Sequence, residues 1–460
     1  MRHRSNARTC WYKSLALSTA LAALFAPAAG AAQITVAMDD PQWTFLLKNN
    51  PGTQGTAELS RDEGEFFRNI QPLLSSGNYA GALAEFEKRN SNEDGAALHE
   101  LRGQILLNLK RYNDAERALN KALELQPGLS VSHRALGMLH LMQKDYKNAR
   151  RHLVKTIELG GGDAQTYGQL AYVNLQTGKP HTAVAGYQNA LFLDADNTQW
   201  YQGLLYALIQ SDDLTQAGSL VNEMLVDDPD NRKLWLQRAQ IAMRAGDDIR
   251  ALASMETALE LGEKRADNIA MAAQLHMQQG SPDRAVELLA SDLRKFVRSD
   301  NIDTVYQMAA WMASRDQWTP LARLLKAVDG AGKSIPAQER AGFLVLNAQM
   351  AMANRHYKTA HSKLNQAIDL SPAHGEALLT MARLQRQRNN LQSADMYYLR
   401  AEALDDYKAR ALQGRAQVEI DRKDYASALK LLRKLYKEEP GRQQVFENIQ
   451  ALERIVRNQA

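Results

Sequence analysis

Cysteine is almost absent from this sequence, which contains a single one, Cys10, among 460 residues. A disulfide framework and a cysteine-ligated metal site are therefore excluded. Cys10 precedes the first apolar run, whereas the acylated cysteine of a bacterial lipoprotein directly follows such a run, so lipid attachment is not expected. A chain that needs no thiol suits an oxidising compartment.

Glycine, proline and long apolar runs are also scarce. The 27 glycines and 12 prolines are too few for a collagen-like or mainly disordered chain. The apolar run Leu15 to Ala26 is about a dozen residues long, short of the ~20 that span a bilayer. Basic residues precede this run and Ala29-Gly30-Ala31 follows it, which is the order of a secretory signal. We expect residues 1–31 to be a cleaved signal peptide and the mature protein to be soluble in the periplasm.

Net charge disappears once this signal is removed. The sequence has 56 Lys and Arg against 52 Asp and Glu. Arg2, Arg4, Arg8 and Lys13 lie before residue 33, where there is no acidic residue, and 56 − 4 leaves 52 basic against 52 acidic residues. A neutral chain has no general attraction to nucleic acid or to anionic lipid. We therefore expect neither a nucleic-acid partner nor a transmembrane segment after cleavage.

A short motif recurs along most of the remaining chain. Tyr112-Asn-Asp-Ala115 returns as Tyr146-Lys-Asn-Ala149, Tyr357-Lys-Thr-Ala360 and Tyr425-Ala-Ser-Ala428. The final alanine serves as a marker, and it occurs as Ala82, Ala115, Ala149, Ala183, Ala217, Ala251, Ala285, Ala360, Ala394 and Ala428. Most intervals are 34 residues and one is 33, while the 75 residues from Ala285 to Ala360 leave room for one degenerate unit with Trp318 and Leu321. Such a fixed period indicates a repeat architecture.

Further small residues keep the same register. Gly103, Gly137 and Ala171 lie twelve residues before a marker, and Ala122 and Ala190 lie seven after one. This order resembles the tetratricopeptide repeat, over roughly residues 63 to 441. The resemblance implies an all-α fold, a right-handed superhelical solenoid of about eleven helix-turn-helix units. Because one helical hairpin cannot bury its apolar face alone, neighbouring units must stack.

The repeats suggest a division of the chain into segments. After the signal, residues 32–62 carry no repeat and are either an N-terminal cap or a docking peptide. Residues 63–300 are a first block of repeats, 301–340 a degenerate repeat with a flexible insertion, and 341–441 a second block. The insertion, around Gly330, Gly332 and Pro336, marks a point where the array bends or divides. Residues 442–460 are expected to form a capping helix.

Two motifs that could carry chemistry are better explained as parts of the helical repeat. Ala327 to Ser334 matches a loose phosphate-binding loop, but that loop needs a preceding strand, and Leu321 to Val328 is predicted to be helical. His99 and His133 share one place in adjacent units, where the family packs a large side chain between helices. We find no nucleophile-base-acid set either, so we expect no catalytic residues, no metal site, no cofactor and no enzymatic activity.

The resemblance also implies that the first helix of each unit lines an inner groove. The partner-binding residues predicted there are Met138, Tyr172, Tyr206, Gln240, Met243, Gln274, Met277, Gln349, Arg383 and Arg386. Glutamine amides suit the backbone of an extended peptide, and methionine adapts to its side chains. We expect Tyr172 and Tyr206 to be exposed in this groove, and Tyr112 and Tyr146 to be buried between helices. The alternative is that these residues only fill the inner curve of the superhelix.

These observations predict a periplasmic scaffold or adaptor that binds a partner peptide or domain in its groove, during envelope assembly or transport. Exported relatives serve in polysaccharide export, outer-membrane assembly or TonB-linked transport, and the resemblance does not choose among them. The alternative is a glycan- or cell-wall-binding factor of an exopolysaccharide export system that uses Tyr172 and Tyr206 as a stacking platform. Protein or peptide partners in the envelope are expected first, and a glycan second.

The signal pattern generates a test. We expect cleavage between residues 31 and 33, because small residues follow the apolar run there. N-terminal sequencing and intact mass of the periplasmic form check this expectation. A chain that keeps Met1, or that carries the mass of an acyl group, contradicts it.

Overall fold

All regular structure in the described part of the chain is helical. The computed structural model describes residues 41, 43, 57–90, 93–299 and 301–459. These residues form 24 α-helices and one short 3-10 turn, so the predicted all-α helical-repeat solenoid is confirmed. The helices belong to two compact units, Thr35–Asp247 and Asp248–Ala460. Within the described residues, none of the helices combines the length and the hydropathy that a membrane span requires.

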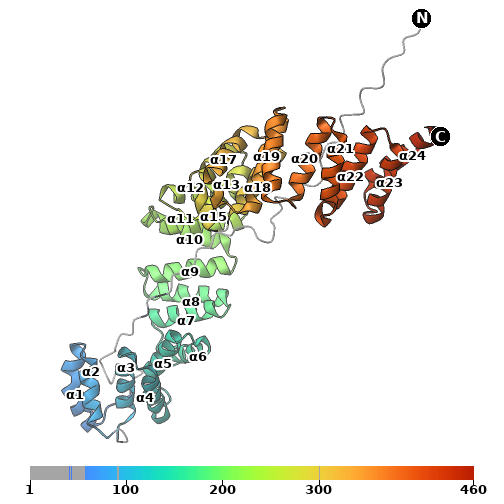
Figure 1. Cartoon of the computed structure of the whole chain (residues 1–460). Coiled ribbons are helices and arrows are strands. Elements are labelled where there is room, and N and C mark those ends of the chain that lie inside the picture. Colours follow the sequence, from blue (N-terminus) through green and yellow to red (C-terminus); the bar gives the residue numbers. More distant parts are fainter. Residues whose placement is uncertain (1–40, 42, 44–56, 91–92, 300, 460) are drawn as a thin grey trace. The chain divides into compact units, whose positions relative to one another are not determined.

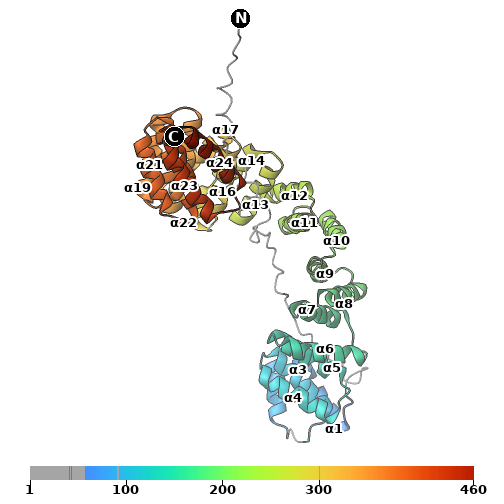
Figure 2. The ribbon, with the colours of Figure 1, turned by 90° about the vertical axis from the view of Figure 1, so that its right-hand side faces the viewer.

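The first unit contains five helix pairs and one further helix. Its helices are α1 (Arg61–Ser75), α2 (Tyr79–Glu87), α3 (Ala96–Asn108), α4 (Tyr112–Leu125), α5 (Ser130–Met142), α6 (Tyr146–Glu158), α7 (Ala164–Gln176), α8 (Pro180–Leu193), α9 (Thr198–Gln210), α10 (Leu214–Asp227) and α11 (Arg232–Arg244). Each helix packs against the next, and Figures 1 and 2 show α7, α8, α9 and α10 following one another in this way.

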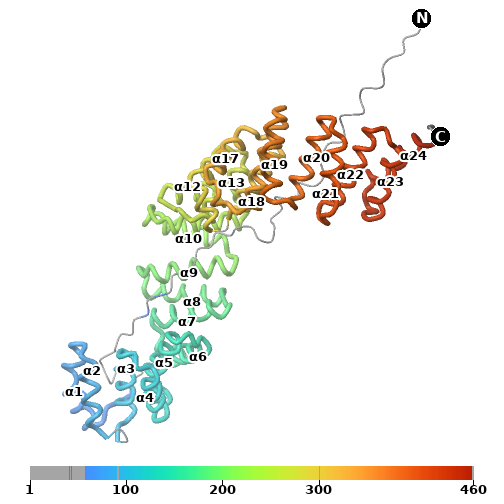
Figure 3. The backbone as a smooth tube through the Cα atoms, in the orientation of Figure 1, coloured from blue at the N-terminus to red at the C-terminus, as the bar shows by residue number. Residues whose placement is uncertain are grey.

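The second unit continues the same alternation of first and second helices. Its helices are α12 (Asp248–Glu260), α13 (Ala266–Gln278), α14 (Pro282–Ala290), α15 (Leu293–Arg298), α16 (Ile302–Ser314), α17 (Trp318–Ala331), η1 (Gly332–Ser334), α18 (Ala337–Ala353), α19 (Tyr357–Leu370), α20 (Gly375–Gln387), α21 (Leu391–Glu402), α22 (Asp405–Asp421), α23 (Tyr425–Glu438) and α24 (Gln443–Gln459). The backbone trace in Figure 3 shows the short turns that join α20 to α23. At the end, α24 packs Val445, Ile449 and Leu452 against Leu432 and Leu435.

Every helix pair reverses direction at a residue with positive φ. These residues are Gly77, Lys110, Lys144, Gly178, Asp212, Gly246, Gly280, Asp316, Arg355, Asn389 and Lys423. Each lies five positions before a marker alanine, or before Leu321 in the degenerate unit. The next residue donates its N–H to the carbonyl five positions earlier, at 2.8–3.0 Å in all eleven turns, which is the Schellman way of ending a helix. The turns therefore confirm eleven units in the register that the markers predict.

The marker residues lie at the tightest points between helices. All ten alanines and Leu321 are 0% exposed. The second small position allows equally close contact, since a Cβ on Gly103 would lie 2.5 Å from Cγ of Leu119, and one on Gly137 would lie 2.8 Å from Cδ2 of Leu153. Larger side chains at these places would separate the two helices of a pair.

The segment 301–340 is more regular than the sequence suggests. Trp318 begins α17 and Leu321 is buried in the core, as in a complete unit. The predicted insertion at 329–338 consists of the end of α17, η1 and the start of α18, and it is anchored by Ile335, which is 1% exposed. The extra length is taken up partly by α15, which no pattern indicated. The boundary between the compact units lies instead at Asp247 and Asp248, within the sixth unit.

The turns generate a test of backbone strain. Gly178 and Gly280 have φ values of +71° and +74°, and a Cβ there would meet no atom within 4 Å. Gly178→Ala and Gly280→Ala should each lower the free energy of unfolding by roughly 1–2 kcal/mol, because only the left-handed conformation penalises alanine. Chemical denaturation of each variant measures this loss.

Gly64→Ala is the matched control. Gly64 lies inside α1, where an added Cβ again meets nothing within 4 Å, so alanine should be neutral or stabilising. Equal losses for all three variants would show that the turns carry no special strain.

Candidate functional site

The first helices of the pairs lie beside one another within each unit. In the first unit α3 contacts α5, α5 contacts α7, and α7 contacts α9. In the second unit the same relation joins α13, α16, α18, α20 and α22 in turn. We call the surface formed by these helices the inner face. The inner face is the candidate interaction site because it carries the residues that the resemblance assigns to the groove.

The predicted groove residues differ in accessibility. Tyr206, Gln240, Met243, Gln274, Gln349, Arg383 and Arg386 are half-buried. Met138, Tyr172 and Met277 are buried, with 1%, 6% and 1% of their surface exposed. These three residues belong to the core between helices at least as much as to the inner face.

The expected contrast between two pairs of tyrosines is wrong. Tyr172 is buried rather than exposed, while Tyr112 and Tyr146 are only half-buried. The physical reason is an aromatic residue outside the repeats, since Trp43 packs against Tyr172. Tyr206 stays half-buried, so the two tyrosines do not form an equivalent exposed pair.

An aromatic cluster surrounds Tyr172. The ring centroids of Trp43 and Tyr172 are 5.5 Å apart in an edge-to-face arrangement. Trp43 also stacks on Trp200 at 6.2 Å. Tyr146 lies 6.4 Å from Tyr172, and Tyr187 lies 6.5 Å from Trp200. We call these five rings the aromatic cluster; such offset and edge-to-face pairs are the favourable ones.

Two glycines make room for this cluster. A Cβ on Gly168 would lie 2.3 Å from Cζ3 of Trp200, and one on Gly203 would lie 2.4 Å from Cε1 of Tyr187. The second arrangement recurs in the other unit, where a Cβ on Gly414 would lie 2.2 Å from Cε1 of Tyr398. Both tyrosines lie four residues after a marker and both glycines fourteen before the next. That spacing is the signal by which the sequence could have revealed the cluster.

Several buried polar atoms on first helices lack a partner. Oε1 of Gln104, Oε1 of Gln169 and Nε1 of Trp200 have no hydrogen-bond partner in the part of the chain that the structure describes. The amide nitrogen of Gln169 donates only to the sulfur of Met138, at 3.2 Å. An unsatisfied buried polar group costs about 1–3 kcal/mol. Since these atoms are inaccessible, their cost falls on the stability of the first unit.

The arginines predicted for the groove connect neighbouring helices. Arg383 donates to Oε1 of Glu376 at 3.0 Å within α20. Arg386 on α20 donates to Asp421 on α22 at 2.8 Å, and Arg410 on α22 donates to Glu376 at 2.8 Å. Both groove arginines are therefore already paired, and of the two it is Arg386 that joins α20 to α22.

A buried carboxyl group also lies between first helices. Glu100 on α3 accepts a hydrogen bond from the Ser132 hydroxyl on α5 at 2.7 Å. Burial raises the pKa of Glu100 to about 7, although the hydrogen bonds from Ser132 and the charge of Arg134 act against that rise. Glu100 is therefore partly protonated near neutral pH, and the folded state holds its proton more tightly than the unfolded chain does.

Three histidines cluster behind the inner face. The Nδ1 atoms of His133 and His152 are 3.0 Å apart, and the rings of His140 and His152 stack at 5.5 Å. Burial, together with the charge of Arg151 and the neighbouring histidines, lowers the pKa of His152 to about 4. Among the described residues, no group of three His, Cys, Asp or Glu side chains has an arrangement that could hold a metal ion.

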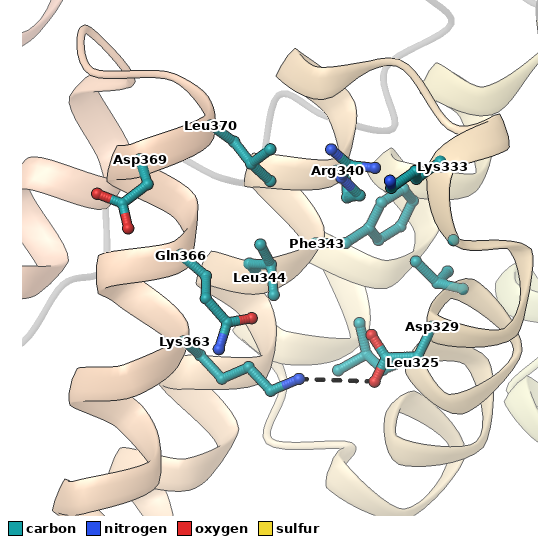
Figure 4. A pocket seen from close by; sticks show the side chains of 12 residues that line it. Leu325, Asp329, Lys333, Arg340, Phe343, Leu344, Lys363, Gln366, Asp369 and Leu370 are labelled. Carbon is teal, nitrogen blue, oxygen red and sulfur yellow. Dashed lines mark ion pairs between the residues drawn. The ribbon is translucent and has the colours of Figure 1, made fainter.

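The second unit contains a pocket of about 430 Å³ between α17, η1, α18 and α19 (Figure 4). Leu325, Phe343 and Leu344 form its apolar lining. Lys363 and Asp329 approach each other at 3.6 Å, the ion pair that Figure 4 marks. The lining also includes Lys333, Arg340 and Asp369, so that three basic and two acidic side chains border the pocket. The former phosphate-loop candidate lies here, but α17 precedes it where that loop needs a strand.

Comparison with known proteins agrees with this geometry. Residues 96–129, which span α3 and α4, match the family model described as tetratricopeptide repeat. No curated protein matches the chain at a significant level. Three solved structures of low sequence identity are similar to parts of this chain.

The first is YrrB, a TPR protein with an unusual peptide-binding site, at 18% identity and a TM-score of 0.38, with 44% of this chain and 97% of that chain covered. The second is a chain of Naa15/Naa10 bound to HypK-THB, at 15% identity and 0.39, with 81% and 68% covered. The third is a tetratricopeptide repeat protein from Parabacteroides merdae, at 15% identity and 0.35, with 49% and 90% covered.

The eleven turns, the buried markers and the adjacent first helices define a helical-repeat solenoid. The second pair, residues 96–129, is in addition similar to the tetratricopeptide repeat of the family model. This fold implies a scaffold for protein–protein interaction.

The buried carboxyl group generates a test by pH. Glu100→Gln keeps the shape of the protonated side chain but cannot ionise. Because the folded pKa is raised to about 7, the stabilising contribution of the protonated form is complete below the unfolded pKa and is lost as pH rises through 7. The variant should therefore match the parent near pH 5 and be more stable by roughly 2–3 kcal/mol near pH 8.

Denaturant unfolding at both pH values measures the difference. Glu65→Gln in α1, a partly exposed carboxyl, is the control and should show no such change with pH. A loss of stability for Glu100→Gln at pH 8 would mean that the ionised carboxylate is the stabilising form.

Proposed function

We propose that this protein is a non-catalytic scaffold that binds an extended segment of a partner polypeptide along its inner face. The observation that carries the proposal is the pattern of accessible side chains there. Half-buried Tyr206 lies on α9 of the inner face, and half-buried Gln240 and Met243 lie on α11, the next first helix of the first unit. Flexible apolar chains and amides alternate, which suits a peptide of mixed sequence.

The chemistry of the amides favours a backbone as ligand. A glutamine side chain offers two donors and one acceptor, so it can pair with both the N–H and the C=O of an extended strand. Methionine is unbranched and polarisable, and therefore fits different side chains without a fixed pocket.

We further propose that the protein works in the periplasm, in envelope assembly or transport. The order of basic, apolar and small residues before residue 32 supports export, and these residues lie outside the described part of the chain. The absence of cysteine after residue 10 is compatible with an oxidising compartment.

A glycan-binding role receives less support from the inner face. Stacking of a sugar requires an open aromatic face, and Tyr172 has only 6% of its surface exposed while Trp43 packs against it. The proposed ligand is therefore a polypeptide.

The inner-face hypothesis generates a binding test. A photo-crosslinking residue at position 240 first identifies the partner, which is then purified. Combined Gln240→Ala and Met243→Ala should weaken binding of that partner about tenfold or more, because truncation of interface anchors typically costs 1–2 kcal/mol or more. Isothermal titration measures the affinity, and thermal melting should show that folding is unchanged.

The matched control lies on α10, the second helix of the preceding pair. Val226 is 80% exposed and Glu223 is also exposed, so replacing both by alanine should leave the affinity unchanged. If the α10 variant weakens binding and the inner-face variant does not, the partner binds to the outer helices and the proposal is wrong.

A further inference from the structure

Trp43, which precedes the repeats in the sequence, contacts the inner face several pairs along the first unit. Trp43 packs beside α7 and α9, which belong to the fourth and fifth pairs. Ala57, the next described residue, packs with Ala97, Ala122 and Leu129 at the second pair. Thirteen residues lie between Trp43 and Ala57, and a chain of that length can reach up to ~45–50 Å when extended. Trp43 thus precedes Ala57 in the sequence but contacts later pairs of the first unit.

Trp43 packs against Tyr172 and Trp200, and we call the space that its ring occupies beside them the pocket. Tyr172 meets it edge to face and Trp200 stacks on it, so two walls of the pocket are aromatic. Tyr172 and Trp200 are 6% and 4% exposed, and Trp43 itself is half-buried. Trp200 can take this position only because Gly168 lacks a Cβ. The walls are thus held by α7 and α9, and Trp43 comes from outside the repeat array.

The pocket also contains an unused donor. Nε1 of Trp200 is buried, and no acceptor for it occurs among the described residues. A carbonyl of an extended backbone can accept from an indole N–H. A bound polypeptide could thus supply both a ring and an acceptor to the pocket.

We propose that the pocket of Tyr172 and Trp200 is a tryptophan-binding site for an extended polypeptide, and that Trp43 is its built-in competitor. This inference rests on the proposed function, because it names the anchor residue that the partner inserts into the inner face. A tethered occupant acts at an effective concentration in the millimolar range. A partner therefore displaces Trp43 only if it contacts further first helices in addition to the pocket.

The test uses the full chain and a synthetic peptide of residues 36–50 carrying a fluorescent label. Fluorescence anisotropy measures its binding to the parent chain and to the Trp43→Ala variant. Removal of the competitor should tighten peptide binding at least about tenfold, as expected when an intramolecular occupant is lost. The same peptide with Trp43→Ala should bind the variant chain at least about tenfold more weakly.

Two chain variants serve as controls. Trp43→Phe keeps an aromatic ring in the pocket, so it should block the peptide nearly as well as the parent does. Phe192→Ala removes an aromatic side chain that is 88% exposed on α8, and it should not change peptide binding. Thermal melting of each variant shows whether the fold is intact.

The outcomes separate this inference from the proposed function. If the peptide binds the parent and Trp43→Ala equally, or if its own tryptophan is dispensable, Trp43 is only a structural contact and the inference is overturned. If Trp43→Ala does not fold, Trp43→Leu, which also lacks the aromatic ring, takes its place, and equal peptide binding by Trp43→Leu and the parent overturns the inference as well. In either case the dependence of partner binding on Gln240 and Met243 still decides the proposed function.

Discussion

The reversal of the chain between the two helices of each pair is the constraint on which the rest of this structure depends. Each reversal places one residue in the left-handed region and ends the first helix with an N–H bound to the carbonyl five residues earlier. Glycine adopts this conformation without strain, yet seven of the eleven turns use Lys, Asp, Arg or Asn. At those seven residues, the hydrogen bonds of the turn and the buried marker five residues later stabilise a backbone conformation that is unfavourable for any residue except glycine.

The fixed geometry of the turns also decides which side chains can meet. Because every second helix begins at the same distance from its turn, the markers all meet the preceding helix, and the first helices of neighbouring pairs lie side by side. Contacts between pairs are then local, as with Arg415, which binds Asp395 and Glu402 on the helix before its own. Stability in such an array approximates a sum over neighbouring pairs.

The repeated part of the fold could be predicted because its signals are local. The alanine markers, the small residues twelve before them and the turn residues recur at a constant spacing, and even the degenerate unit keeps its turn at Asp316 and its core residue at Leu321. The short helix α15 and the anchoring of Ile335 could not be predicted, because they fill space left by neighbouring helices and follow no period.

The candidate site was less predictable for the same reason. The position of Tyr172 within its repeat places it on the inner face. That position cannot show that Trp43, some 130 residues earlier, packs against it. In the sequence, the aromatic packing is indicated only by the spacing of Tyr187 and Gly203, which recurs in Tyr398 and Gly414.

The position of the boundary between the two compact units affects how the chain unfolds locally. It lies at Asp247 and Asp248, directly after the turn residue Gly246, so α11 belongs to one unit and α12 to the other. The boundary between the compact units therefore falls in the middle of a repeat, between its first and its second helix. Cooperative opening follows compact packing more closely than sequence repetition. The backbone amides that exchange together in the second unit should accordingly begin with α12, a second helix, and not with the start of a repeat.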